Sequence, residues 1–428
     1  MRAGRLDIEE RNRLLAEMTD EVAVLVLRSN YLQTQAISMM QKLSGPRLGA
    51  KQHFISVLEN EGQLDRGLEF LPDDEELHER RQRGLGMTRP ELSVLLSYSK
   101  IRLYQELLRS DVPEDAYLSR ELHGYFPQPL QERFHDLMPG HRLKREIIAT
   151  MVTNSVVNRM GVSFVIRMRD DTSATPGEIA RAYTIAREVI DARSFWARVE
   201  ALDNAVDADL QNEARLAMWN FLRQVTRWLA SRPGWSLDIS EVVGRLKPGL
   251  DQLRQSGRRL MSPEDQQLAQ QVAQKFMDGG FDDDLAWQAA SLRHLANAFD
   301  MIDMAANRHI EPLAVARVYY DLGESLGLRW FRSQVEALAV EGQWHAHARG
   351  NLREELNQHQ RSLAARVLDK EGNDDDAVQR WLGGHETEVK RVTDMVTDMR
   401  DLPAMDYATL SVAVRSLAHM LAATEHPA

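Results

Sequence analysis

Apolar residues recur every three or four positions along most of this 428-residue chain, and almost no stretch alternates apolar with polar residues. The first spacing places apolar side chains on one side of an α-helix, whereas a half-buried strand needs alternation. One such stripe runs through Leu14, Leu15, Met18, Val22, Leu25 and Val26. The pattern predicts an all-α fold of two or three helical subdomains with little or no sheet.

Several helices are expected to begin at recognisable residues. Thr88–Glu91 and Thr175–Glu178 each have the form of a capping box, in which the two side chains bond each other's backbone amides. Asp282–Asp284 precede a long apolar pattern that continues to Phe299, so we expect one long helix there. Only Gly161–Met168 resembles a strand, and because one strand cannot form a sheet we expect it to be helical or irregular.

Glycine and proline gather in two regions, Ser44–Gly86 and Pro233–Pro263. We therefore expect a first part at 1–86, with an N-terminal helix and a loop-rich connector. A helical subdomain at 87–232 and a C-terminal helical bundle at 233–428 would follow.

Composition excludes several classes of function. The net charge of −11 argues against a nucleic-acid binder, which usually carries a basic surface. The chain has no cysteine, which excludes disulfides, thiolate zinc sites and a cysteine nucleophile, and fits a reducing cytoplasm. The longest aliphatic run, Val22–Leu27, is far shorter than the roughly 20 residues that span a bilayer. We expect a cytoplasmic protein with no membrane partner.

Two kinds of residue cluster suggest metal binding and are better explained otherwise. His345, His347 and His359 include a pair two positions apart, which a helix points to different sides, so no metal site is expected. Asp282–Asp284 and Asp374–Asp376 lack the alternating oxygen ligands and central glycine of a calcium loop. Acidic residues at helix starts are the better interpretation.

Signals of nucleotide chemistry are equally sparse. Gly84 and Gly86 are a fragment of a dinucleotide fingerprint, but no strand precedes them and the third glycine is missing. No phosphate loop, nucleophile elbow or glycine-flanked catalytic lysine occurs in the sequence.

A basic group could bind an anion or an acidic partner, although a salt-bridged helix face is the simpler interpretation. Its members are His141, Arg142, Lys144, Arg145, Arg159, Arg167 and Arg169.

The helix that follows is apolar on most sides, so it is expected to be buried all round. Thr150, Asn154 and Asn158 form a polar line along it. Because buried amides need partners, we expect a hydrogen-bond ladder to the helix at 91–109 or 178–190, with a ligand site as the alternative.

Four blocks of sequence carry a family resemblance: RNRLLAEMTDEVAVLVLRSNY (Arg11–Tyr31), MTRPELSVLLSYSK (Met87–Lys100), HRLKREIIATMVTNSVVNRMG (His141–Gly161) and LGLRWFRSQVEAL (Leu326–Leu338). Together, and in this order, they resemble the C-terminal region of the large bacterial NAD-specific glutamate dehydrogenases. The likeness extends along nearly the whole chain, with looser agreement at Pro233–Phe281 and from Asp369 onwards.

The resemblance implies an enzyme that oxidises L-glutamate to 2-oxoglutarate and ammonia with NAD. The family's catalytic and nucleotide-binding residues belong to a core upstream. No position here matches them, so we predict no catalytic, cofactor-binding or metal residue in this chain. The chain alone should then be inactive and bind no NAD.

The resemblance also implies partners. They are the catalytic core of the same enzyme and neighbouring subunits of a homo-oligomer. The first helix should expose apolar surface through Val22, Leu25 and Val26, which that core would cover. Two alternatives from other classes remain: a free-standing helical interaction or scaffold protein without activity, and a helical DNA-binding module, which the net charge disfavours.

Overall fold

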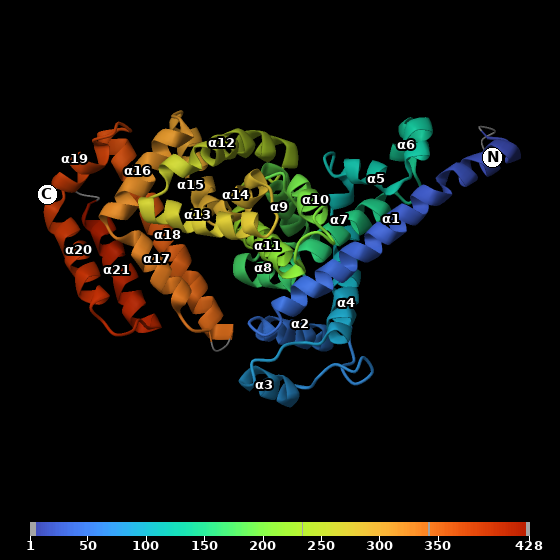
Figure 1. Ribbon diagram of the computed structural model, residues 1–428, viewed down its shortest axis with the longest axis horizontal. Coiled ribbons are helices and arrows are strands. Elements are labelled where there is room, and N and C mark those ends of the chain that lie inside the picture. Colours follow the sequence, from blue (N-terminus) through green and yellow to red (C-terminus); the bar gives the residue numbers. More distant parts are fainter. Residues whose placement is uncertain (1–5, 233, 341–342, 425–428) are drawn as a thin grey trace. The chain divides into compact units, whose positions relative to one another are not determined.

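The computed structural model of the chain consists almost wholly of helices (Figure 1). It describes residues 6–232, 234–340 and 343–424, and within these ranges it contains no strand. The all-α prediction is therefore confirmed. The strand-like segment Gly161–Met168 runs from the end of one helix into the next, α8 (Phe164–Thr172), as expected for a helical segment.

The remaining helices follow one another with short connections. The α-helices are α1 (Ile8–Lys42), α2 (Leu48–Asn60), α3 (Asp74–Gln82), α4 (Arg89–Leu108), α5 (Ser119–Tyr125), α6 (Gln128–Phe134), α7 (Lys144–Met160), α9 (Pro176–Val189), α10 (Ala192–Glu200), α11 (Ala208–Ala230), α12 (Ile239–Leu260), α13 (Pro263–Asp278), α14 (Asp283–Ser291), α15 (Ala298–Arg308), α16 (Pro312–Ser325), α17 (Leu328–Ala337), α18 (Gln343–Glu371), α19 (Ala377–Gly383), α20 (Glu386–Arg400) and α21 (Tyr407–Ala423). Short 3-10 helices lie at η1 (Val112–Glu114), η2 (His135–Gly140) and η3 (His294–Asn297).

The chain forms two compact units, and neither is one continuous segment. Unit 1 comprises Met1–Glu188 with Leu222–Val242, and unit 2 comprises Val189–Phe221 with Val243–Ala428. Helices α11 and α12 therefore contribute residues to both units. The boundaries expected at residues 86 and 232 come from breaker-rich sequence rather than from packing, and they stay a prediction.

Helix α7 forms the core of unit 1 and packs against α1, α4, α5 and η1. None of residues 146–160 is fully exposed, and Ile148, Val152 and Val156 are buried. A helix that is apolar around most of its circumference needs neighbours on every side. The helix is buried on most of its circumference, but a line of half-buried residues that includes Thr150 and Asn154 shows that it is not buried on every side as predicted.

Polar contacts anchor helix α1 on either side of an exposed central stretch. Towards its start, Glu17 pairs with Arg133 of α6 at 2.6 Å, and Glu21 accepts a hydrogen bond from the Gln128 amide at 2.8 Å. Towards its end, Gln35 accepts a hydrogen bond from Arg159 of α7 at 2.7 Å. Every residue from Val22 to Asn30 is exposed, and we call this stretch the exposed segment.

The core of unit 2 surrounds α18, which packs against α16, α17, α19 and α21. Tyr319 and Trp381 are fully buried there. Gln360 of α18 is also buried, and its amide donates to the Tyr319 carbonyl at 2.7 Å. This bond satisfies a polar side chain inside the apolar core.

The long helix expected from Asp282–Asp284 to Phe299 is interrupted, so that prediction was wrong. The segment contains α14, then η3, then α15. At the interruption the His294 carbonyl accepts a hydrogen bond from the Tyr320 hydroxyl at 3.3 Å. A tertiary contact thus uses a backbone group in the stretch where the α-helix changes to a 3-10 turn, and apolar spacing along the chain does not reveal such a contact.

Candidate functional site

The basic group does not form one continuous patch, because most of its arginines contact different neighbours. Arg159 donates to Gln35 of α1, and Arg169 pairs with Glu106 of α4 at 3.2 Å. Arg145 pairs with Glu114 and donates to the Leu108 carbonyl at 2.8 Å. These contacts match the interpretation of a salt-bridged helix face.

Arg145 acts at the end of α4, where backbone carbonyls lack partners within the helix. Besides the Leu108 carbonyl, it reaches the Ser110 carbonyl at 3.3 Å. A cation at the C-terminal end of a helix also interacts favourably with the helix dipole. Arg145 therefore joins α7 to the end of α4 and to η1.

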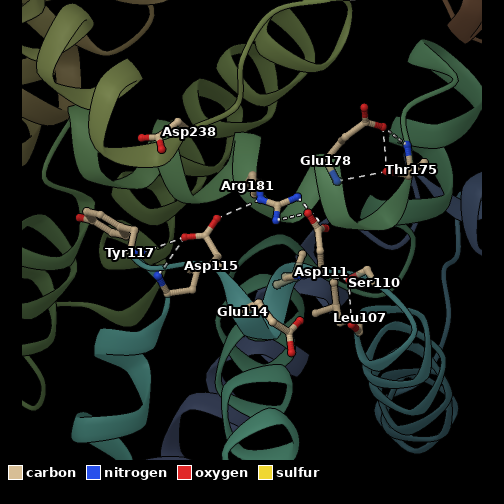
Figure 2. Close-up of polar contacts among 12 residues, drawn as sticks. Leu107, Ser110, Asp111, Glu114, Asp115, Tyr117, Thr175, Glu178, Arg181 and Asp238 are labelled. Atoms are coloured by element: carbon tan, nitrogen blue, oxygen red, sulfur yellow. Dashed lines mark hydrogen bonds and ion pairs between the residues drawn. The ribbon is translucent and has the colours of Figure 1, made fainter. Parts of the chain in front are cut away.

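A second arginine, from α9, contacts the same turn after α4. Figure 2 shows Arg181 of α9 between Asp111 and Asp115, bonding the first at 3.1 Å and the second at 3.0 Å. The Arg181 guanidinium holds the pKa of the Asp111 carboxyl below its ordinary value. Asp115 also accepts the Tyr117 amide at 2.9 Å. The Arg181 donors and the Asp111 and Asp115 acceptors thus bond one another, and the arrangement holds α9 to the turn after α4.

Helix α9 begins at the capping box predicted from sequence. The Thr175 amide donates to the Glu178 carboxylate at 2.8 Å, and the Glu178 amide donates to the Thr175 hydroxyl at 3.3 Å (Figure 2). The first capping box is also present, with the Thr88 amide donating to Glu91 at 2.7 Å.

The hydrogen-bond ladder expected along α7 is absent from the described residues, so that prediction was wrong. Thr150 bonds the Glu146 carbonyl of its own helix at 2.7 Å. Asn158 is buried, and its side-chain oxygen has no hydrogen-bond partner within the described part of the chain. The polar line therefore supports neither a ladder nor a ligand site.

The polar contact between α7 and α9 involves residues that the sequence did not single out. Arg187 is 3% exposed and donates to the Ser155 hydroxyl at 2.7 Å, and the Tyr183 hydroxyl donates to the Ser155 carbonyl at 3.0 Å. Arg187 also pairs with Glu121 of α5 at 3.1 Å and with Glu188 at 2.6 Å. The sequence did contain one indication of this contact: Arg187 follows Tyr183 by four positions, so both lie on the same, mostly apolar, face of the helix.

The three histidines considered for metal binding lie along α18. The His345 ring stacks on Tyr407, with 5.0 Å between ring centroids, and the His347 ring lies 6.0 Å from that of Trp344. Burial lowers the pKa of His359. Within the described ranges no three histidine or carboxylate side chains converge as metal ligands would.

The acidic clusters begin helices, as predicted. Asp282 accepts the Leu285 amide at 3.0 Å at the start of α14, and it pairs with Arg198 at 2.6 Å. Asp374 accepts the Asp376 amide at 3.0 Å just before α19, and it pairs with Arg380 at 2.8 Å.

The glycine pair near residue 85 serves backbone packing. Gly84 has a φ of +67°, which favours glycine. A Cβ on Gly86 would lie 2.4 Å from the Ser44 Cβ, so only glycine fits beside this serine. The neighbouring Met87 amide donates to the Ser44 hydroxyl at 2.6 Å. The two glycines thus allow the backbone of the connector to turn and to pack closely against Ser44.

The exposed segment of α1 carries the longest run of consecutive exposed apolar residues in the described part of unit 1. Val24, Val26 and Leu27 are 62%, 54% and 67% exposed. Val22 and Leu25, at 43% and 37%, confirm the predicted apolar surface of the first helix. Contiguous apolar surface of this kind marks an interaction site. The described helices include none that is long and apolar enough to cross a membrane.

Together these observations describe a helical protein whose charged side chains connect helices and whose first helix is incompletely covered. Comparison with known proteins identifies the family. The family model "Glutamate dehydrogenase, C-terminal" matches residues 84–419, and "Bacterial NAD-glutamate dehydrogenase, catalytic domain" matches residues 1–40. The chain belongs to the family of glutamate dehydrogenase C-terminal regions.

Curated relatives agree with this assignment. The chain is 41% identical to an NAD-specific glutamate dehydrogenase of Halomonas elongata, over 97% of its length. It is 37% identical to one of Pseudomonas aeruginosa over 100% of its length, and 28% identical to one of Mycobacterium tuberculosis over 98%. In each case the match covers 26% of the relative, so the chain spans about a quarter of the length of these proteins.

Proposed function

We propose that this chain is the C-terminal helical region of an enzyme that oxidises L-glutamate to 2-oxoglutarate and ammonia with NAD. Its role in that enzyme is structural: it packs on the catalytic core and contributes contacts between subunits. The main support for this role is the exposed segment, Val22–Asn30. It falls inside the residues matched by the catalytic-domain family model.

The physical basis of this role is the apolar run within that segment. Val22–Leu27 are six consecutive apolar residues, and at 100° per residue they cover the full circumference of a helix. Neighbours from unit 1 hold α1 on either side of the run, so rotation of the helix cannot hide it. Covering a valine or leucine side chain contributes about 1.5–3 kcal/mol. A groove in the catalytic core that encloses α1 provides such cover.

The test is binding between this chain and the separately produced catalytic core, measured by calorimetry. We expect Val24→Thr with Leu27→Gln to weaken binding at least tenfold, because both side chains lose apolar contact. The matched control is Ile101→Thr on α4, a residue that is 53% exposed in the same unit. The control should bind like the unmodified chain. Equal binding by the double variant would mean that the core contacts another surface, and no binding by the unmodified chain would favour a free-standing interaction protein.

The second part of the proposal concerns activity. The chain alone is expected neither to reduce NAD with glutamate nor to bind NAD. The reason is that the resemblance assigns the catalytic and nucleotide-binding residues to the core. A turnover assay and an NAD titration by calorimetry test this directly. Saturable NAD binding in the micromolar range would contradict it.

A further inference from the structure

The loop that joins α2 to α3 in unit 1 exposes two large apolar side chains (Figure 1). Phe70 is 90% exposed, more than any other large apolar residue that the structure describes, and Leu68 is 77% exposed. We call these two residues the apolar tip. Leu64 and Leu71 of the same loop are buried. The loop therefore has an inner apolar side that packs and an outer apolar side that does not.

The backbone of the tip is strained at Phe70. Its φ of +52° lies in the left-handed region, which bulky residues rarely adopt and which glycine or asparagine adopts more easily. Strained residues of this kind gather at functional sites, where the surrounding structure holds them in place. A phenylalanine here disfavours folding through its backbone and buries little of its ring. Its side chain is better explained by a contact outside this chain.

The two ends of the loop are fastened to each other by one arginine. Arg66 pairs with Glu59 of α2 at 2.6 Å and with Asp74 of α3 at 3.0 Å. It also donates to the Pro72 carbonyl at 3.3 Å. The loop is therefore tied across its base to both flanking helices.

Further hydrogen bonds fix the tip itself. The Asp65 carboxylate accepts the Gly67 amide at 3.0 Å and the Leu68 amide at 3.1 Å. Glu69, which lies between the two exposed residues, accepts the Tyr98 hydroxyl of α4 at 2.6 Å. The tip is thus held in one geometry before any partner arrives, so little conformational entropy is lost when a partner binds.

The surface around the tip is acidic. Residues 59–83 include nine acidic residues and four arginines, and two of these arginines, Arg66 and Arg80, pair with acids of the same stretch. Several exposed carboxylates there form no ion pair with another described residue: Asp65, Asp73, Glu75 and Glu79. A partner with basic side chains around an apolar pocket complements this surface. A second copy does not, because a twofold contact would place the same acidic surface against itself.

The position of the tip in the chain indicates which surface covers it. The catalytic-domain model matches residues 1–40 and the C-terminal model matches residues 84–419, so the tip lies between the two matched regions. This connector is joined to the end of α1, where Arg89 of α4 donates to Ser38 at 3.0 Å and to Gln41 at 3.1 Å. Under the proposed function, the catalytic core and the helical region meet at this connector.

We propose that Leu68 and Phe70 insert into an apolar pocket with a basic rim on the catalytic core of the parent enzyme. The inference rests on the proposed function, and it adds a second contact that is separate from the exposed segment of α1. An aromatic side chain that fills a pocket contributes much of the affinity of an interface. The acidic surroundings of the tip favour encounter with the basic rim.

The first test is binding of Phe70→Asn to the separately produced catalytic core, measured by calorimetry. We expect binding to weaken about tenfold or more, because the aromatic anchor is lost. The melting temperature of the variant should stay the same or rise, since asparagine tolerates the left-handed backbone. A residue that served folding alone would lower the melting temperature and leave binding unchanged. The matched control is Leu402→Asn in a turn of unit 2, a residue that is 46% exposed.

The second test concerns charge. Glu75→Gln with Glu79→Gln should weaken binding to the core and reduce its dependence on salt, because both carboxylates face the basic rim. Equal binding and equal salt dependence would contradict that rim. If the core binds the unmodified chain and Phe70→Asn equally well, this proposal is overturned and the proposed function stands. If the core does not bind the unmodified chain, both are overturned.

Discussion

Helices α1 and α7 pack against each other in unit 1, and both contain long apolar stretches, but their surroundings differ completely. In α7 none of residues 146–160 is fully exposed, whereas in α1 every residue of the exposed segment is. Apolar residues cover much of the circumference in both helices. Composition therefore does not explain why one helix is exposed and the other is covered. The difference lies in how many neighbouring helices pack against each of them.

The difference shows what an apolar helix requires. Helix α7 obtains its cover from α1, α4, α5 and η1 of the same unit. The exposed segment has no such cover from the described helices, although the residues beside it are well anchored. Its apolar side chains then contribute to stability only when another surface encloses them.

The largest expected effect tests the cover of α7. Ile148 has no exposed surface, so Ile148→Ala should lower the free energy of unfolding by about 2–5 kcal/mol. Leu25→Ala in the exposed segment should change it by less than about 0.5 kcal/mol. Urea denaturation of the two variants measures both. Losses of similar size would mean that α1 is covered in the isolated chain.

Helix α2 extends the comparison, because it buries a charge where α7 buries apolar groups. The pKa of Lys51 lies below the unfolded value in the folded chain, at about 7 instead of 10.5. The unfolded chain thus binds more protons between these values, and the contribution of Lys51 to stability rises with pH across that window. This contribution of Lys51 to stability is fully lost once the pH has fallen through 7, where the folded chain also binds the proton.

Lys51→Met removes this penalty. At pH 6 we expect the variant to be more stable than the unmodified chain, by on the order of 3 kcal/mol. The gain should shrink as pH rises towards 10.5. Denaturation at pH 6 and pH 9 measures the two differences. A gain that does not depend on pH would show that Lys51 is not charged at pH 6 in the folded chain.

A smaller effect concerns the polar groups on α7. Because the buried Asn158 oxygen has no partner in the described structure, Asn158→Leu should leave stability unchanged or raise it by about 1 kcal/mol. Ser155→Ala should lower stability by a similar amount, since it leaves a buried Arg187 donor unpaired. Thermal unfolding of both variants decides the matter. Destabilisation by Asn158→Leu would restore the ladder that the sequence suggested.

These two positions show where inference from the sequence succeeds and fails. Helices and their starts depend on local spacing and on side chains three residues apart, so Thr175–Glu178 could be predicted. The partner of a buried polar group depends on which helix packs nearby, so the sequence pointed to Asn158, whose oxygen has no partner in the described structure, and not to Ser155, which bonds Arg187.

The same limit applies to charge. Lys51 lies at helical spacing among leucines and isoleucine, and nothing in that pattern shows that the charge of Arg167 on α8 acts on it. The basic group was recognisable as such from the sequence, and the separation of Arg145, Arg159 and Arg167 into different environments was not. The exposed segment could be foreseen only through the family resemblance, which placed a core beside it.

The smallest change in folding stability is expected for the exposed segment itself. Val24→Thr preserves shape, and Leu27→Gln preserves helix propensity, so together they should alter the free energy of unfolding by less than about 0.5 kcal/mol. Their effect should appear in association instead. The unmodified chain exposes six consecutive apolar residues and is expected to self-associate as its concentration rises, or to exchange amide hydrogens rapidly in α1. Sedimentation velocity over a concentration series should show less association for the double variant and no change for Ile101→Thr. A monomer at every concentration, with α1 amides protected as well as those of α7, would mean that an apolar helix needs no cover here and that the contrast between the two helices has no energetic meaning.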